Sequence, residues 1–312
     1  MGALTSGIWC GGVCQKAAHR GVGTASTKTE SKWRSNLADH QPKMASPPKP
    51  TLLVCLEGLI GAGKSTVLAE IEKMKLPLVK VLYERVDDWK AVEMEDGDGK
   101  SANMLACMYS GSLSSAVFQL AIMQSRFGAL VKTLCEKGVR VVISERGPWS
   151  EKMVFAKSNL DKNEFAAYTY AQDAMLRELF PLAGPVAVSF LYLTLDIDDV
   201  MARIATRGRV EESSISREYM QTLDDAHTRM ESTLGTSELG VPNIVGTTKH
   251  VHVDASKTPS QVAAAVVQAI ERLLATDDFQ DTSVATLAPP VRAKPRRSRA
   301  RRFVWAMPVL LK

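Results

Sequence analysis

The sequence predicts an α/β fold in which a five-stranded parallel sheet is flanked by helices. Apolar runs typical of buried strands alternate along the chain with longer segments of helical periodicity. The segments between consecutive strands are long enough for crossover helices, which join parallel strands and cover both faces of a sheet. Charged residues follow several of the strands. Because the ligands of such sheets bind beyond the carboxyl ends of the strands, we expect the functional site there.

The strands and helices of this fold can be placed by residue number. The apolar runs predict strands at 52–56, 79–83, 139–144, 188–195 and 251–254. Helical periodicity and helix-end signals predict helices at 65–74, 114–136, 162–179, 198–206, 216–234 and 258–275. No internal repeat is visible. We therefore expect one globular domain over residues 51–276.

The charge of the chain is unevenly distributed. Residues 1–50 carry seven Lys and Arg against two acids, and residues 289–312 carry eight against none. The part between them has 24 basic and 32 acidic residues, a net charge of −8, although the whole chain is at +5. The first 50 residues lack helix or strand periodicity and end in a proline-rich stretch. We therefore expect basic, disordered extensions at 1–50 and 277–312.

These extensions bear on partners and location. The basic C-terminal run is of the kind that binds nuclear import receptors, nucleic acid or anionic lipid, although many such runs are simply solvated. The N-terminal extension is basic and poor in acids like a mitochondrial presequence, and Met1-Gly2 with Ser6 fits a myristoylation pattern. No apolar stretch reaches 18 residues, so no transmembrane segment is expected. We expect a cytoplasmic protein, with the nucleus and the mitochondrion as alternatives.

A glycine-rich loop follows the first predicted strand. Residues 58–65 spell G-x-x-x-x-G-K-S, the pattern of a loop whose backbone N–H groups surround phosphates. Lys64 would then lie between the β- and γ-phosphates, Ser65 would ligate Mg²⁺, and the next helix would direct its positive end at the anion. The expected phosphate donor is ATP or another nucleoside triphosphate. The predicted phosphate-binding residues of this loop are Gly58, Gly61, Ala62, Gly63, Lys64, Ser65 and Thr66.

The ends of the second and third strands carry residues suited to phosphoryl transfer. Glu84 could take a proton from an attacking hydroxyl, and Trp89 could form a wall for the ring of the acceptor. Glu145 could serve Mg²⁺, and Arg146 the charge that develops on the transferred group. Each of these could instead be an ordinary solvated or core residue. Their common position at strand ends after a phosphate loop favours the functional interpretation.

Three arginines follow the fourth strand within seven residues. Arg203, Arg207 and Arg209 stand just before two glutamates, on and after a predicted helix. A solvated, charged helix end is the alternative interpretation. Three guanidinium groups that can each bind phosphate oxygens suit a lid that closes over a triphosphate.

The order of these motifs resembles the deoxynucleoside kinase family, which includes deoxycytidine, deoxyguanosine and mitochondrial thymidine kinases and viral relatives. The resemblance runs from about residue 52 to residue 254. It rests on G-x-x-x-x-G-K-S, Glu-x-Val-x-x-Trp, Met-Tyr, Phe-Gln, Glu-Arg-x-x-x-Ser and the Arg-rich segment with Glu-Glu. The resemblance implies a P-loop kinase fold with an Arg-rich lid, phosphorylation of a deoxyribonucleoside at its 5′-hydroxyl with ATP and Mg²⁺, and a homodimer.

The resemblance also implies individual roles. Glu84 corresponds to the general base and Arg146 to the phosphate-stabilising arginine, with Lys64 as the third predicted catalytic residue. Tyr109 and Glu212 correspond to the pair that holds the 3′-hydroxyl. The predicted substrate-binding residues are Glu84, Trp89, Met108, Tyr109, Phe118, Gln119, Arg126, Arg146, Glu151, Phe155 and Glu212.

The predicted preference for a base depends on three of these residues. Gln119 corresponds to the side chain that reads the base edge, and Arg126 lies two helical turns after it. Together with Glu151, Arg126 resembles the Arg–carboxylate pair of the deoxycytidine and deoxyguanosine branch. We expect deoxycytidine or a purine deoxynucleoside to be preferred over thymidine. The alternative is that Arg126 and Glu151 form an exposed ion pair on the rim of the pocket.

The chain departs from the family at two positions, and two other functions stay open. Arg85 stands where the family usually has Pro, and Gly147 where it usually has Ser. A nucleoside monophosphate kinase shares the loop, the sheet and the Arg-rich lid. It would need additional cations near Trp89, and only Arg85 and Lys90 are near it in sequence. The non-enzyme alternative is an inactive nucleotide-binding subunit, in which Lys64, Glu84 or the lid arginines should have been lost.

Overall fold

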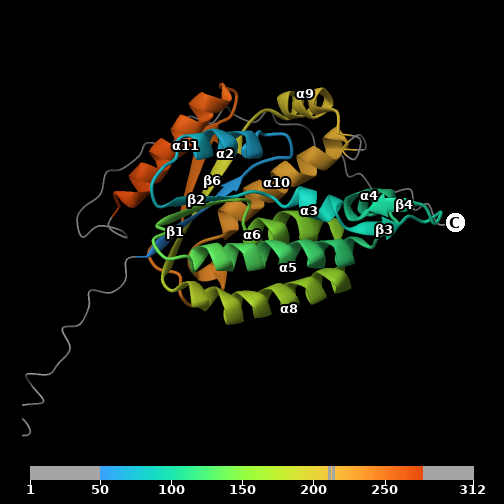
Figure 1. The fold of residues 1–312 in the computed structure, drawn as a ribbon, viewed down its shortest axis with the longest axis horizontal. Helices are drawn as coiled ribbons and strands as arrows, with labels where there is room; N and C mark the ends of the chain where they lie inside the picture. The colour runs from blue at the N-terminus through green and yellow to red at the C-terminus, as the bar shows by residue number, and fades with distance from the viewer. Residues whose placement is uncertain (1–49, 210–211, 213–214, 277–312) are drawn as a thin grey trace, which may run out of the picture. The chain divides into compact units, whose positions relative to one another are not determined.

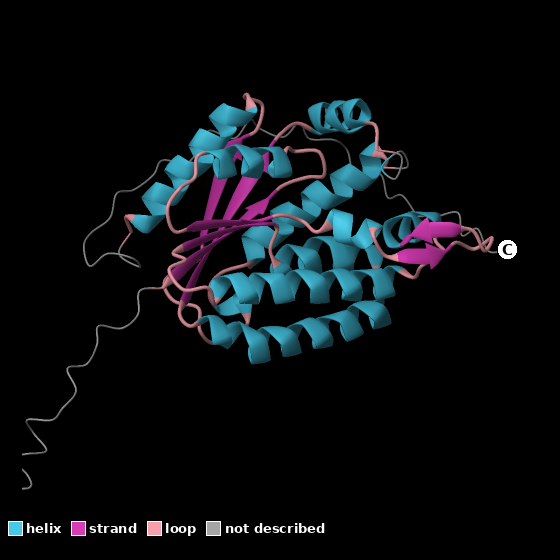
Figure 2. Cartoon of the chain, viewed as in Figure 1, coloured by secondary structure: helices cyan, strands magenta, loops and turns pink. Residues whose placement is uncertain are grey.

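A five-stranded parallel sheet forms the centre of the domain, as the sequence predicts. The computed structural model describes residues 50–209, 212 and 215–276, so the two basic extensions and the partner and compartment predictions that rest on them lie outside the described residues. The strands are β1 (Thr51–Glu57), β2 (Val79–Leu82), β5 (Val141–Glu145), β6 (Val186–Thr194) and β7 (Lys249–Asp254). Their order is β2-β5-β1-β6-β7, and every neighbouring pair is parallel (Figure 2).

Helices cover both faces of this sheet (Figure 1). One layer contains α2 (Lys64–Lys73) and α11 (Pro259–Leu274), and the other contains α5 (Ser115–Leu134), α8 (Lys162–Leu179) and α10 (Arg217–Thr233). A further helix, α9 (Ile197–Arg207), follows β6. All six helices lie within about two residues of their predicted bounds.

Alternating side chains of β1 supply the two hydrophobic cores. Leu52, Val54 and Leu56 pack in the cluster that contains residues of α2 and α11. Leu53 and Cys55 pack in the cluster that contains residues of α5, α8 and α10. Because successive side chains of a strand point to opposite faces, one fully buried strand can hold both layers of helices in place. The carboxyl end of β1 is therefore fixed from both sides.

Several short elements were not predicted. They are α3 (Val86–Lys90), the hairpin of β3 (Glu93–Glu95) and β4 (Ser101–Asn103), α4 (Met104–Ser110), α6 (Pro148–Ser150), a π-helical turn (Glu151–Ala156), α7 (Lys157–Asn159) and two 3₁₀ turns (Phe180–Ala183 and Ser237–Leu239). Each is too short to show a period in the sequence. Three of these elements matter for the site, because they come after the carboxyl ends of strands. Helices α3 and α4 come after β2, and the π-helical turn comes after β5 and α6.

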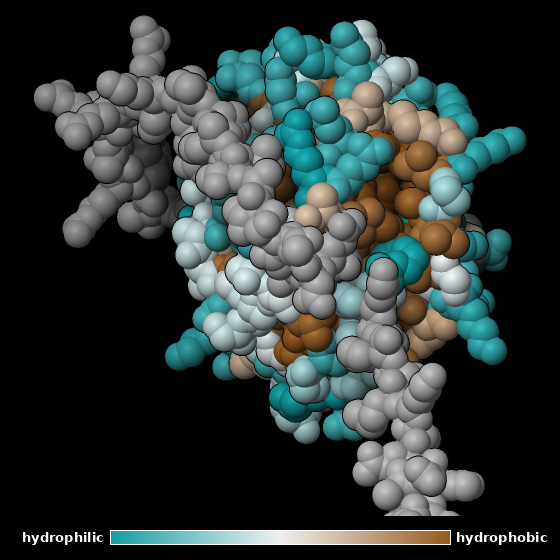
Figure 3. All heavy atoms as spheres, turned by 90° about the vertical axis from the view of Figure 1, so that its left-hand side faces the viewer, coloured by the Kyte–Doolittle hydropathy of each residue, from teal (hydrophilic) through white to brown (hydrophobic). Residues whose placement is uncertain are grey.

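Among the described residues, no helix is both long enough and apolar enough to cross a bilayer. Figure 3 shows one face of the molecule, on which hydrophilic residues surround patches of apolar ones.

The turn after β5 is tightly packed against β1. Arg146 has a φ of 65°, in the left-handed region that residues with a side chain rarely adopt. At Gly147, a Cβ atom would lie 2.5 Å from Cys55 Sγ and 3.2 Å from Cys55 Cβ. The Ser that the resemblance implies at this position would therefore collide with Cys55. The departure at Gly147 is explained by the cysteine that occupies this space.

We expect Gly147→Ala to lower the free energy of unfolding by about 1–3 kcal/mol, the usual cost of an extra methyl group in a filled core. In the Cys55→Ala background the same substitution should cost less, because the sulfur atom is gone. Urea unfolding of the wild type, both single variants and the double variant would measure the coupling. Strictly additive changes in the free energy of unfolding would show that Cys55 does not restrict position 147.

Candidate active site

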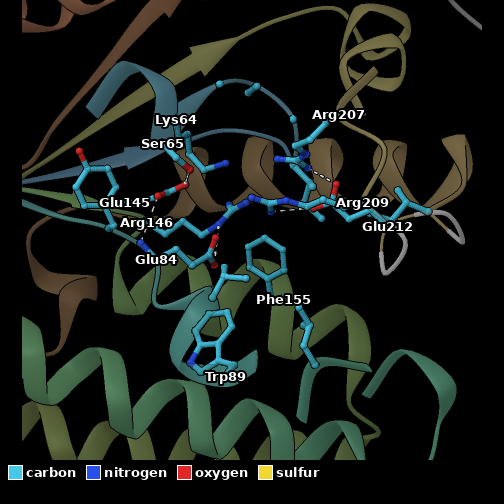
Figure 4. A pocket seen from close by; sticks show the side chains of 18 of the residues that line it. Lys64, Ser65, Glu84, Trp89, Glu145, Arg146, Phe155, Arg207, Arg209 and Glu212 are labelled. Atoms are coloured by element: carbon cyan, nitrogen blue, oxygen red, sulfur yellow. Dashed lines mark hydrogen bonds and ion pairs between the residues drawn. The ribbon is translucent and has the colours of Figure 1, made fainter. Parts of the chain in front are cut away.

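A cavity of about 1080 Å³ opens beyond the carboxyl ends of the strands. Figure 4 shows its charged residues gathered around Glu84 and Arg146, with Trp89 below and Glu212 to one side. Every predicted site residue except Gly58 lines this cavity: Gly61, Ala62, Gly63, Lys64, Ser65, Thr66, Glu84, Trp89, Met108, Tyr109, Phe118, Gln119, Arg126, Glu145, Arg146, Glu151, Phe155, Arg203, Arg207, Arg209 and Glu212. Their common location is a finding of the structure, and their chemical roles remain predictions.

The glycine-rich loop connects β1 to α2. Gly63 has a φ of 97° and stands directly before the first turn of α2, a conformation that glycine adopts at little cost. Lys64 is buried, and its Nζ donates to the carbonyl oxygens of Gly58 and Leu59 at 3.1 and 2.9 Å. Burial, helped by Arg146, lowers the pKa of Lys64 to about 7. A phosphate group beside this amine would favour its charged form.

Gly58 has a different position from the other loop residues. Its carbonyl oxygen accepts hydrogen bonds from Lys64 Nζ and from Arg146 Nη1, both at 3.1 Å. A Cβ atom at Gly58 would lie 2.7 Å from the carbonyl oxygen of Leu193 on β6. Gly58 thus orients two cations and allows close packing of strands, and it does not line the cavity.

The oxygen atoms at the start of α2 and the end of β5 form a fitting set for Mg²⁺. Ser65 Oγ donates to Glu145 Oε1 at 2.8 Å, and the backbone N–H of Glu84 donates to Glu145 Oε2 at 3.3 Å. A hydroxyl and a carboxylate oxygen are ligands that Mg²⁺ accepts, usually together with waters and substrate phosphates. No group of three or more His, Cys, Asp or Glu residues is suited to a metal within the described ranges. The residues present therefore fit an ion that the nucleotide would help to hold.

Two buried arginines surround the carboxylate of Glu84. Glu84 Oε1 lies 3.2 Å from Arg126 Nη1 and 3.7 Å from Arg146 Nε. Burial of Glu84 favours the protonated form, but Arg146 and then Arg126 outweigh it, and the pKa of Glu84 is lowered. Glu84 is therefore a carboxylate at neutral pH.

Aromatic and apolar side chains from α3, α4 and α5 form the other end of the cavity. Trp89 and Phe118 meet edge to face with ring centroids 6.0 Å apart, and Trp89 Nε1 donates to Ser125 Oγ at 3.3 Å. Trp89 and Phe118 belong to a small core cluster that Met108 packs against. Such a pocket suits a flat ring system.

Arg126 and Glu151 form a buried ion pair at the base of this pocket. Arg126 Nε lies 2.8 Å from Glu151 Oε1, and the two side chains are 9% and 6% exposed. The alternative of an exposed pair on the rim is therefore wrong. Burial raises the pKa of Glu151 to about 7 even though Arg126 opposes the shift. Arg126 also donates to the backbone carbonyl of Glu145, which fixes its guanidinium group.

The three arginines of the predicted lid differ in their contacts. Arg207 forms an ion pair with Glu212, and Arg209 Nη1 lies 3.3 Å from Glu212 Oε1. Arg203 donates instead to the carbonyl oxygens of Ala62 and Ala255, at 3.2 and 2.9 Å. Arg203 therefore ties the glycine-rich loop to the end of β7 while it lines the cavity.

The cavity also contains residues that the sequence analysis missed. Asn159 and Tyr219 line it, and Asn159 Nδ2 donates to Tyr219 Oη at 3.3 Å and to the carbonyl of Phe155 at 2.8 Å. Other lining residues are Ile60, Val67, Tyr83, Val86, Asp87, Lys90, Leu105, Ser115, Ile122, Ile215, Ala255, Lys257, Pro259 and Val262. Ile60 is a variable position of the glycine-rich loop, Val86 and Asp87 belong to the Glu-x-Val-x-x-Trp segment, and Tyr83 ends a predicted strand; the others stand in no quoted motif. Of the two cations considered for a monophosphate kinase, Arg85 pairs with Asp88 and does not line the cavity, whereas Lys90 lines it.

The chain is similar to viral and cellular kinases. It is 26% identical over 207 residues to a protein of Invertebrate iridescent virus 6 that is provisionally named kinase protein 143R. The match covers 65% of this chain and 93% of that one. It is 27% identical over 223 residues to the thymidine kinase of Ictalurid herpesvirus 1, covering 71% of this chain and 86% of that one. It is 27% identical over 194 residues to deoxycytidine kinase 2 of Gallus gallus, covering 56% and 71%.

The family model for deoxynucleoside kinases matches residues 54–275, from β1 to the end of α11. This range contains the glycine-rich loop, the strand-end residues, the pocket and the arginines described above. The chain therefore belongs to the deoxynucleoside kinase family, and it is a phosphotransferase that acts on deoxynucleosides.

Proposed function

We propose that the chain transfers the γ-phosphoryl group of ATP to the 5′-hydroxyl of a deoxyribonucleoside and prefers deoxycytidine or a purine deoxynucleoside to thymidine. The observation that carries the proposal is the position of the Glu84 carboxylate. It lies between the glycine-rich loop and the aromatic pocket and contacts Arg126 and Arg146. A hydroxyl group next to a ring in the pocket would meet an ionised carboxylate on the side facing the phosphate loop.

The reaction follows from this arrangement. Glu84 accepts the proton of the 5′-hydroxyl while the hydroxyl oxygen forms a bond to the γ-phosphorus. The bond between the γ-phosphorus and the β–γ bridging oxygen breaks in line, and its electron pair leaves with the nucleoside diphosphate. Arg146, whose Nη1 is held by the carbonyl of Gly58, stabilises the charge on the transferred group. The lowered pKa of Glu84 keeps the base ready at neutral pH.

The remaining groups bind and orient the donor. Backbone N–H groups of the glycine-rich loop and Lys64 would hold the phosphates, and Arg207 and Arg209, which line the same cavity, would bind phosphate oxygens as the lid. Ser65 and Glu145 would hold Mg²⁺, which supplies neutralisation of phosphate charge when it is bound. ATP as the donor is part of the proposal.

The acceptor is held by the pocket at the other end. Trp89, Met108, Phe118 and Phe155 would enclose the base and the sugar, and Tyr109 with Glu212 would bind the 3′-hydroxyl. Gln119 is buried in α5 and would pair with the edge of the base.

The preference for the base is argued from the buried pair. The similar proteins include one named for thymidine and one named for deoxycytidine, so the preference is argued from the pocket itself. In its ionised form, which the ion pair with Arg126 favours, the Glu151 carboxylate can accept a hydrogen bond from an exocyclic amino group, which cytosine and adenine have and thymine lacks. Thymidine would direct its O4 acceptor at this carboxylate, a mismatch that costs about 1–3 kcal/mol in a buried site.

Glu84→Gln should remove most of the turnover, with kcat lower by about 10²–10⁴-fold, because the proton acceptor is lost. Binding of ATP should stay within about threefold of wild type, since the glycine-rich loop is untouched. Steady-state assays with deoxycytidine, together with equilibrium binding of a fluorescent ATP analogue, would measure both. Glu178→Gln on the exposed face of α8 is a matched control that makes the same chemical change outside the cavity. A Glu84→Gln enzyme with wild-type kcat would exclude Glu84 as the base.

Replacing Arg126 by Met and Glu151 by Ala together should shift the preference towards thymidine by about tenfold in kcat/KM ratio, because the buried mismatch is removed. The double substitution is preferred to either single one, because removing one partner leaves a buried charge unpaired. Assays of the four deoxynucleosides and their monophosphates with wild type and double variant would measure the ratio. A wild-type enzyme that already prefers thymidine by tenfold would contradict the assignment of the pair.

A further inference from the structure

A buried acid and a buried imidazole face each other just outside the cavity. Glu57 is the last residue of β1 and is fully buried, and His227 lies on α10 with 6% exposure. Glu57 Oε2 and His227 Nε2 lie 3.9 Å apart, and neither atom has a hydrogen-bond partner among the described residues. Neither residue lines the cavity. A buried polar atom without a partner is costly, so the pair calls for an explanation.

The hydrogen bond of His227 to the backbone determines which ring nitrogen carries the hydrogen. His227 Nδ1 lies 2.8 Å from the carbonyl oxygen of Leu223, which can only accept, so Nδ1 carries the hydrogen. In the neutral ring, Nε2 is then an acceptor directed at Glu57. Burial lowers the pKa of His227 to about 3, with Arg146 as the next cause. Burial raises the pKa of Glu57, although Arg146 and Lys64 oppose the shift. Burial therefore disfavours the charged form of both groups, and at 3.9 Å they face each other without a hydrogen bond.

The other oxygen of Glu57 holds the turn that carries Arg146. Glu57 Oε1 accepts the backbone N–H of Gly147 at 2.9 Å. The backbone N–H of Arg146 donates to the carbonyl of Leu56 at 3.0 Å, and its Nη1 donates to the carbonyl of Gly58 at 3.1 Å. Leu56 and Glu57 of β1, and Gly58 directly after it, thus hold one turn, in which Arg146 has its unfavourable φ of 65°. Of these three acceptors, Glu57 is the one that uses a side-chain oxygen, and the Gly147 N–H also donates to Ser150 Oγ at 3.3 Å.

His227 supports the same arginine through an aromatic ring. The His227 ring meets Phe155 edge to face, with centroids 6.4 Å apart. The guanidinium carbon of Arg146 lies 4.4 Å from the centre of the Phe155 ring. Glu57 therefore holds the backbone of Arg146, and His227 supports the ring beneath its guanidinium group.

We propose that Glu57 and His227 are positioning residues for Arg146: the Glu57 carboxyl accepts from the Gly147 N–H and holds the turn, and the His227 ring packs against Phe155 beneath the guanidinium group. The proposal rests on the proposed role of Arg146 in phosphoryl transfer. It assigns Glu57 a function as the side-chain acceptor of this turn. If Arg146 acts on charge that develops during transfer, loss of this support lowers kcat and leaves the binding of substrates nearly unchanged.

Glu57→Gln tests whether the acceptor alone is needed. The amide keeps an oxygen that can accept from the Gly147 N–H and cannot carry a negative charge. We expect kcat within about twofold of wild type for this variant. Glu57→Leu removes the acceptor of the Gly147 N–H, and Glu57→Asp moves it away by one methylene group. The kcat of both variants should fall about tenfold or more, with both KM values within about threefold. His227→Leu should lower kcat likewise, and the double variant with Glu57→Leu should lose about the product of the two factors, because the two residues support different parts of Arg146.

Two controls separate this proposal from its alternatives. Thr169→Val on α8 removes another buried atom without a partner and should leave kcat unchanged. Thermal unfolding and ATP-analogue binding of each variant verify that the protein is folded. A folded Glu57→Gln variant with kcat reduced tenfold would show that the negative charge is needed, and Glu57→Leu with wild-type kcat would show that the contact is not. Arg146→Lys with wild-type kcat would overturn the role of Arg146 itself, so the two failures are distinguishable.

Discussion

Two arginines are buried at the carboxyl end of the sheet, and the surrounding acids compensate their charge. A buried guanidinium group without partners would cost several kcal/mol, so its neighbours are strongly constrained. Arg126 contacts Glu84 and Glu151, and Arg146 contacts Glu84 and the carbonyl of Gly58. The strand ends, the glycine-rich loop and the π-helical turn must all be in place for these contacts to form. The proposed chemistry depends on the same cluster, because the arginines that need an anion also keep Glu84 ionised.

The sequence was sufficient for the regular part of the fold. β1 and β5 are continuous apolar runs that a parallel sheet buries on both faces, and α5 and α10 are long enough to show helical periodicity. The site residues within motifs were found for a related reason: a phosphate loop needs glycine and lysine at fixed spacing, and parallel strands end at one edge. Glu84 and Glu145 could therefore be placed beside Lys64 before any coordinates were known.

The rest depends on contacts between residues distant in sequence. Nothing in the spacing of Glu57 and His227 indicates that they meet, since one ends a strand and the other lies within a long amphipathic helix. Tyr219 was missed because a helix that packs on the core also turns a few side chains towards the cavity. In the sequence, Gly147 is a departure from the family pattern. The structure explains it, because Cys55 occupies the space that a side chain at position 147 would need. The division of the three arginines, with Arg203 bonded to backbone carbonyls, likewise follows from tertiary packing.

The position of Arg203 links the local stability of two segments. Its guanidinium group joins the carbonyl of Ala62 in the glycine-rich loop to that of Ala255, which lies between β7 and α11. If the β7–α11 unit opened, the guanidinium group of Arg203 would lose the Ala255 carbonyl as an acceptor. Arg203 would then hold the glycine-rich loop through Ala62 without being anchored to β7. Partial unfolding of a protein proceeds through such cooperative units. The conformational freedom of the glycine-rich loop is therefore governed in part by how firmly α11, about 200 residues later in the chain, stays docked on the sheet.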